Sequence, residues 1–187
     1  SAQGRRLSSM ECHDLMCFIG QIVVVGGVRR SAMISLSNLS DDRMRHAKSG
    51  QWWETAAHRA LANNSVSYTE KPDIETFMRE WTALVESKSG ERGIFNREAS
   101  KKQAAKFGRR DPNFEFGTNP CSEIILRPYQ FCNLTEVVVR ATDTVDDLER
   151  KVKLATILGT IQSSFTKFPY LRKVWQRNTE EERLLGV

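Results

Sequence analysis

Residues 64–96 restrict the fold more than any other stretch, because two short strand-like segments flank a strongly helical one. "NSVSYT", which starts at Asn64, predicts a short strand, and "GIFN", residues 93–96, predicts the end of another. The segment between them has helix start signals at Pro72 and Asp73 and a stop signal at Gly90. Strand-like and helical patterns alternate along the whole chain, which predicts a mixed α/β fold. The apolar residues of the helical segment follow i, i+3, i+4 spacing: Ile74, Phe77, Met78, Trp81, Leu84 and Val85.

Other segments carry weaker signals of the same kinds. Ser8 and Glu11 have the spacing of a capping box and predict a helix from about Ser9 to Val25, ended by Gly26 and Gly27. The last residues, "EEERLLGV", are helix-like and stop abruptly, so we expect a truncated chain. The remaining predictions are a strand at 31–37, helices at 54–62, 97–108 and 145–161, and apolar runs at 124–126 and 137–139.

Composition excludes several classes of protein. The 187 residues are 40% hydrophobic and 27% charged, as in a soluble globular domain. No apolar run approaches the roughly 18–20 residues of a membrane helix, and the N-terminus has no secretory signal, so we expect a cytoplasmic location and no membrane partner. The net charge of +5 is spread over pairs such as Arg29-Arg30, which are too short for a nucleic-acid patch.

The four cysteines indicate thiols rather than a disulfide framework. Cys12, Cys17, Cys121 and Cys132 occur without a secretory signal and without a C-x-x-C motif. Cys12 and Cys17 are five positions apart, which suits neither a zinc knuckle nor one face of a helix. We therefore expect no metal site.

One polar alternation stands out at residues 119–123. In an extended segment Asn119, Cys121 and Glu123 would share a face, and a face that mixes a thiol with a carboxylate suggests a partly buried polar pocket. There Glu123 could act as a general base, Asn119 could orient a hydroxyl, and Cys121 could perform thiol chemistry. Spacing alone leaves another interpretation open: turn chemistry at "GTNP", a surface Glu123 and a core Cys121. Cys132, in "FCNL", is on the same grounds a buried inert thiol.

The residue identities add a resemblance. "NPCSE", followed eleven residues after its cysteine by "FCNL", resembles the active site of the catalytic subunit of ribonucleotide reductase. Other similar stretches include "VVGGVRRSAMISL", "AKSGQWW", "LANNSVSYTEKP", "SKSGERGIFNR" and "EEERLLGV". The short gap between the cysteines is most similar to the adenosylcobalamin-dependent branch, class II.

The resemblance implies a fold: residues 1–187 would be an internal fragment of a ten-stranded α/β barrel of the ribonucleotide reductase and glycyl-radical type. Residues 1–37 would form a helix, a specificity-type loop and a strand, and 38–115 a region of helices and short strands. Residues 116–140 would form the active-site finger loop and a strand, and 141–187 would be helical. Helical faces at 74–85 and 145–161 would then leave exposed apolar patches that favour association.

The resemblance also implies roles in reducing ribonucleotides to deoxyribonucleotides. Cys121 would carry the thiyl radical that abstracts the 3′ hydrogen, and Glu123 would take the 3′-hydroxyl proton. Asn119 would hydrogen-bond the ribose, and Cys132 would be one of two thiols that end as a disulfide. The partner thiol has no counterpart in the chain, since neither Cys12 nor Cys17 has a matching context.

The loop "GGVRRSA" resembles the specificity loop of this family, which connects a deoxynucleotide effector to the substrate base. Its residues are Gly26, Gly27, Val28, Arg29, Arg30 and Ser31. Two glycines give the backbone freedom, and two guanidinium groups suit a base or phosphates. From the residues alone, a helix C-cap with solvated arginines is an equally open interpretation.

The implied cofactor is adenosylcobalamin, although no complete site for it can be assigned. The implied partners are a ribonucleotide, a deoxynucleotide effector, a thioredoxin-like reductant and a complementary reductase chain. Two alternatives remain. The chain could come from a class I large subunit, whose cysteines are more widely separated, or it could be a non-catalytic nucleotide-binding piece of a split reductase.

Overall fold

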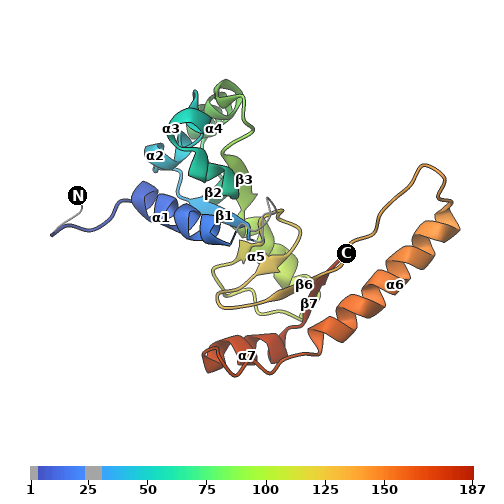
Figure 1. The fold of residues 1–187 in the computed structure, drawn as a ribbon. Helices are drawn as coiled ribbons and strands as arrows, with labels where there is room; N and C mark the ends of the chain where they lie inside the picture. The colour runs from blue at the N-terminus through green and yellow to red at the C-terminus, as the bar shows by residue number, and fades with distance from the viewer. Residues whose placement is uncertain (1–3, 24–30) are drawn as a thin grey trace. The chain divides into compact units, whose positions relative to one another are not determined.

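The computed structural model describes residues 4–23 and 31–187, which fall into two compact units, residues 1–102 and 103–187 (Figure 1). Helix α5 (Arg97–Ala105) runs across the boundary. The mixed α/β class is confirmed, because both units contain helices together with short strands. The three sheets of the described residues have three, two and two strands, and none of them closes into a barrel.

The first unit is built on a parallel sheet with the order β1-β2-β3. The central strand β2 is largely buried, and Val66 at its middle is fully buried. Helix α4 connects β2 to β3, so the predicted strand–helix–strand arrangement of residues 64–96 is confirmed. The elements are α1 (Ser9–Ile22), β1 (Met33–Ser37), α2 (Asp42–Arg45), α3 (Trp52–Thr55), the 3-10 helix η1 (Ala57–Leu61), β2 (Ala62–Tyr68), α4 (Ile74–Ser87) and β3 (Gly93–Asn96).

Local signals explain where the helices of this unit begin. The capping box of α1 is confirmed: the Glu11 N–H donates to the Ser8 hydroxyl, and the Ser8 N–H donates to the Glu11 carboxylate. Asp73 caps α4 by accepting from the Thr76 N–H at 2.8 Å. Helix α1 ends at Ile22, and the predicted stop at Gly26-Gly27 lies outside the described residues.

One prediction for this unit needs correction. The helix expected at 54–62 is divided between α3, η1 and the first residue of β2, and Ala62 pairs with Met33 in the sheet. The helix α4 is present, and Ile74, Met78 and Trp81 of its apolar set are exposed, as predicted for the helical face at 74–85. The structure instead buries Glu80, Ala83 and Ser87 from this helix.

The second unit joins two small sheets to two helices. A two-stranded antiparallel hairpin precedes a parallel pair, and the connection between the two parallel strands contains both helices. The extended segment 135–140 runs beside the long helix before the chain turns back, and the two border a cavity of about 490 Å³ (Figure 1). The elements are β4 (Gly117–Thr118), β5 (Ile125–Leu126), β6 (Cys132–Leu134), α6 (Val145–Ser163), α7 (Lys173–Glu181) and β7 (Leu184–Gly186).

The last strand corrects the prediction for the final residues. We expected 180–187 to be helical, as part of a helical region 141–187, but α7 ends at Glu181 and Leu184–Gly186 form β7. Strand β7 pairs in parallel with β6, with Cys132 opposite Leu184. Pairing with a distant strand therefore outweighs the local helical preference of this segment.

No helix of the described ranges is long and apolar enough to cross a membrane.

Candidate active site

The segment that carries Asn119, Cys121 and Glu123 is the loop of the β4–β5 hairpin. Gly117 pairs with Leu126, and Thr118 pairs with Ile125. Asn119 closes the loop from inside, because its Oδ1 accepts from the Ile124 N–H at 3.0 Å and its carbonyl accepts from the Ser122 N–H at 2.9 Å. Ser122 has a φ of +67°, a left-handed conformation that reverses the chain.

The prediction that these three side chains share one strand face is therefore wrong. Asn119 is buried and occupied with the loop backbone, whereas Cys121 and Glu123 are exposed at the loop tip. The alternation of polar residues is typical of a strand, but here these residues lie in a turn. The turn separates the amide of Asn119 from the thiol of Cys121 and the carboxylate of Glu123. Within this unit the expected partly buried pocket around all three side chains is not formed.

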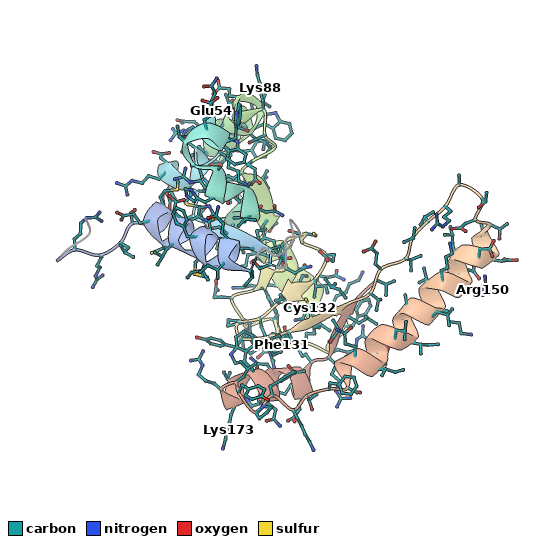
Figure 2. All side chains as sticks on the ribbon, viewed as in Figure 1. Glu54, Lys88, Phe131, Cys132, Arg150 and Lys173 are labelled. Atoms are coloured by element: carbon teal, nitrogen blue, oxygen red, sulfur yellow. The ribbon has the colours of Figure 1, made fainter. Side chains whose placement is uncertain are left out.

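Cys132 lies at the start of β6 and is half-buried (Figure 2). Burial raises the pKa of the Cys132 thiol, and the negative charge of Glu123 raises this pKa further. The charge of Glu123 thus acts on the Cys132 thiol, although the eight residues between them form a strand and a turn. Cys121 and Cys132 are both free thiols, so the hairpin loop and β6 present two thiols and a carboxylate in one unit.

The turn between β5 and β6 rests on residues that the sequence analysis did not select. Arg127, Gln130, Arg110 and Glu182 form a buried polar cluster beneath this turn, which we call the clamp. Phe131, next to Cys132 in Figure 2, packs on Phe168 and Trp175 with ring centroids 4.9 and 4.8 Å away. The available signal was a charged residue inside an apolar run, Arg127 in "IILRPYQF".

The predicted specificity-type loop can be placed only at its end. Gly26, Gly27, Val28, Arg29 and Arg30 lie outside the described residues. Ser31 is described, and its hydroxyl donates to the Gly20 carbonyl at 3.4 Å. This contact ties the end of the loop to the last turns of α1.

Two cavities, one in each unit, lie away from the candidate catalytic residues. A cavity of about 790 Å³ lies at the carboxyl ends of β2 and β3, and neither it nor the cavity beside α6 is lined by the candidate catalytic residues. No group of three or more His, Cys, Asp or Glu side chains in residues 4–23 and 31–187 is arranged to hold a metal ion.

Comparison with known proteins gives the family to which the chain belongs. Over 142 residues the chain is 38% identical to the adenosylcobalamin-dependent ribonucleoside-triphosphate reductase of Lacticaseibacillus paracasei, covering 72% of this chain and 18% of that protein. The protein of the same name from Lactobacillus delbrueckii subsp. bulgaricus is 31% identical over 196 residues, covering 98% of this chain and 24% of the relative. The chain is a homologue of these reductases.

The resemblance found in the sequence is thus confirmed, including its adenosylcobalamin-dependent branch. The chain spans between 18% and 24% of the length of these curated relatives. No family model and no solved structure gives a significant match to the chain. The homology extends over nearly the whole chain, so both structural units belong to the matched region.

Proposed function

We propose that this chain is the part of an adenosylcobalamin-dependent ribonucleoside-triphosphate reductase that carries its radical and reducing thiols. The observation that carries the proposal is that one unit presents the exposed Cys121 thiol on a hairpin loop and the half-buried Cys132 thiol on the next strand, where the Glu123 charge raises the pKa of Cys132. The names of the relatives support the reaction and its triphosphate substrate. They do not favour a class I subunit.

The proposed roles follow the order of the reaction. A thiyl radical on Cys121 Sγ takes the hydrogen atom from C3′ of the ribose, and the Glu123 carboxylate accepts the 3′-hydroxyl proton. The 2′-hydroxyl leaves as water after it takes a proton from a thiol. Two thiols then supply two electrons and form a disulfide, and Cys121 returns its hydrogen to C3′. Cys132 is one of these thiols, and the second is not provided by a matching cysteine of this chain.

The environment of Cys132 supports its role as a proton and hydrogen donor. Burial and the charge of Glu123 raise the pKa of its thiol, so that it stays protonated at neutral pH. A thiol rather than a thiolate is needed to give a proton to the leaving hydroxyl. Asn119 already uses its amide oxygen within the loop, so its amide nitrogen is the group that would donate to the ribose.

The surroundings of the reaction are proposed for the complete protein. Adenosylcobalamin belongs to the proposal through the relatives, and the steps above begin with the radical already on Cys121. In a complete reductase the open sheets would be parts of a ten-stranded α/β barrel. Residues 26–31 would connect a deoxynucleotide effector to the substrate base. A thioredoxin-like reductant would reduce the disulfide again. The complete enzyme would be cytoplasmic and would contain further residues or a complementary chain.

A chimera tests the proposal. This chain would replace the matching segment of the Lacticaseibacillus paracasei reductase, with the parental enzyme as reference. Tritium release from 3′-labelled ribonucleoside triphosphate should persist in Cys132→Ser and vanish in Cys121→Ser, because only Cys121 contacts the 3′ hydrogen. Formation of deoxyribonucleotide over many turnovers should fail in both variants.

Two outcomes would contradict the assignment. Equal tritium release from the Cys121→Ser and Cys132→Ser chimeras would remove the distinction between the two thiols. Turnover by the isolated 187-residue chain with adenosylcobalamin and a dithiol would show that no further residues are needed. A Cys12→Ser chimera is the matched control, because Cys12 is an exposed thiol of the other unit and should leave both measurements unchanged.

A further inference from the structure

The turn between β5 and β6 is fixed by one side chain, Gln130. Gln130 and Arg127 are each only 6% exposed. The Gln130 Oε1 accepts from the Arg127 backbone N–H at 3.0 Å, which closes the turn from within. Cys132 follows two residues later, so the position of Gln130 determines where β6 begins.

Glu182 holds Gln130 from the other side of the unit. One carboxylate oxygen, Oε2, accepts from Gln130 Nε2 at 2.7 Å and from Arg110 Nη2 and Nε at 2.9 and 3.2 Å. Its second oxygen, Oε1, lies 3.9 Å from Arg127 Nη1. Burial alone would raise the pKa of Glu182, but the hydrogen bonds from Arg110 and Gln130 outweigh burial and hold this pKa below its ordinary value. Glu182 is therefore a fixed negative charge that joins three partners.

The two arginines of the clamp are themselves held by aromatic rings. The Arg127 guanidinium lies 4.9 Å from the centroid of Phe114, and the Arg110 guanidinium lies 5.2 Å from that of Phe116. Phe116 is fully buried and directly precedes β4, the first strand of the hairpin. The clamp thus contacts the chain just before the hairpin that carries Cys121 and Glu123, and again just before the strand that carries Cys132.

We infer that Glu182 is a positioning residue, which acts through Gln130 and the two arginines to hold the hairpin that carries Glu123 in a fixed position relative to Cys132 at the start of β6. This inference rests on the proposed function for the meaning of that juxtaposition, since a base and a reducing thiol must meet at one ribose. The contacts of Glu182 with Gln130 and the two arginines exist without a substrate or a radical. A purely stabilising cluster would keep the unit folded without affecting the interaction between Glu123 and Cys132.

A double-mutant cycle on the 187-residue chain separates these two roles. The measured quantity is the rate of iodoacetamide alkylation at Cys132 against pH, followed by mass spectrometry of the Cys132 peptide. Glu123→Gln removes a negative charge near the thiol, lowers its pKa and should raise the alkylation rate near neutral pH severalfold. In the Glu182→Gln background the same substitution should no longer change the rate, because Glu123 is no longer held near Cys132.

Two further variants guard against a loss of folding. Gln130→Met removes the amide that joins Glu182 to the turn, leaves every charge in place and should also abolish the effect of Glu123→Gln. Glu180→Gln is the matched control, because Glu180 is an exposed carboxylate at the end of α7, two residues before Glu182, and accepts only from Gln176 at 2.9 Å among the bonds described. Circular dichroism establishes that each variant retains its secondary structure.

The outcomes are distinct. An undiminished effect of Glu123→Gln in both the Glu182→Gln and Gln130→Met backgrounds overturns the positioning role and leaves the clamp merely stabilising. No effect of Glu123→Gln in the unmodified chain also overturns it, since the two groups would then not face each other. Alkylation needs no radical chemistry. A negative result in the double-mutant cycle would therefore contradict only the positioning role, whereas a negative result for tritium release in the chimera would contradict the proposed function.

Discussion

At the scale of single residues, the most constrained charge of the first unit is Glu80. It is 4% exposed and accepts from Arg45 Nε at 2.6 Å and from Arg92 Nη2 at 2.7 Å. Arg92 also donates to the Ser37 hydroxyl at 2.7 Å and so connects α4 to the end of β1. Burial would raise the pKa of Glu80, but the hydrogen bonds from Arg92 and Arg45 hold it below its ordinary value. The cluster therefore requires Glu80 in its charged form.

Replacement of Glu80 by Gln should lower the free energy of unfolding of the first unit by about 3–5 kcal/mol, because two buried guanidinium groups lose their counter-charge. Since the folded-state pKa lies below the unfolded value, this stability is present above the unfolded pKa and is lost as the pH falls through the folded one. Urea unfolding between neutral and acidic pH should show a smaller acid-induced loss in the variant. The control Glu75→Gln removes an exposed ion pair with Arg79 and should cost under about 1 kcal/mol.

The sequence predicted candidate site residues but not their geometry. Cys121, Glu123 and Cys132 are candidates from the sequence, and in the structure the charge of Glu123 acts on the Cys132 thiol. The prediction of a shared strand face was wrong because the chain reverses at Ser122. This residue has a positive φ, and no glycine in the sequence marks the position as a turn. Glu182 was missed because its partners, Arg110 and Gln130, lie 72 and 52 positions away along the chain. Only the folded chain shows that this glutamate is largely buried.

At the scale of elements, helix α6 turns an unexpected face towards the sheet. Its buried residues are Ala155, Gly159 and Ser163, whereas its larger apolar residues, such as Leu158 and Ile161, are exposed. An added Cβ at Gly159 would clash with Leu185 Cδ1 of β7. Small residues thus allow the helix to lie close to the strand that pairs with β6.

A methyl group at Gly159 should reverse the usual helix preference. In an exposed helix, Gly→Ala stabilises by about 1 kcal/mol, but here the clash with Leu185 should give a net loss of about 1 kcal/mol. In a Leu185→Ala background the same substitution should become stabilising, which thermal unfolding of the four-member cycle would reveal. The control Thr156→Ala, at an exposed position of α6, should change the melting temperature little. If the effects of Gly159→Ala and Leu185→Ala on stability were additive, close packing between these two residues would be excluded.

Periodicity predicted the existence of α1, α4 and α6 well, because capping residues and apolar spacing are local signals. It was less informative about which face is buried. For α4 and α6 the apolar stripe remains largely exposed, as expected for a fragment of a larger fold, and small or paired polar residues form the buried stripe. Strands β4, β5 and β7 have only two or three residues each, which is too short for a period-2 pattern to be recognised.

At the scale of the whole molecule, both units expose large apolar side chains. In the first unit Met16, Phe18 and Ile19 of α1 are each 51% exposed. In the second unit Leu154 and Leu158 of α6 are 56% and 62% exposed. Monomeric soluble proteins rarely leave contiguous apolar surface of this kind uncovered. The exposed patches predicted from the sequence are therefore confirmed, while the association that they favour stays a prediction.

Charge placed on α6 should reduce self-association of the isolated chain. Leu154→Lys combined with Leu158→Lys should lower the weight-average mass at a given concentration in sedimentation velocity experiments, because apolar surface is replaced by mutually repelling charge. The matched control, Thr156→Lys with Thr160→Lys, adds the same charge to exposed polar positions of the same helix. If both pairs reduce the mass equally, the apolar face of α6 is not the cause of association.

The parallel pairing of β6 with β7 has a consequence for the order of folding. The side chain of Asn133, next to Cys132, donates to the Leu184 carbonyl, a partner 51 positions further along the chain. Contacts between such distant positions form late, because the entropy of closing a long loop is lost before they stabilise the chain. During synthesis Cys132 therefore emerges well before its partner strand, and until β7 arrives the thiol is open to solvent and to oxidants. Protection of this sulfur is one of the last steps in folding of the second unit.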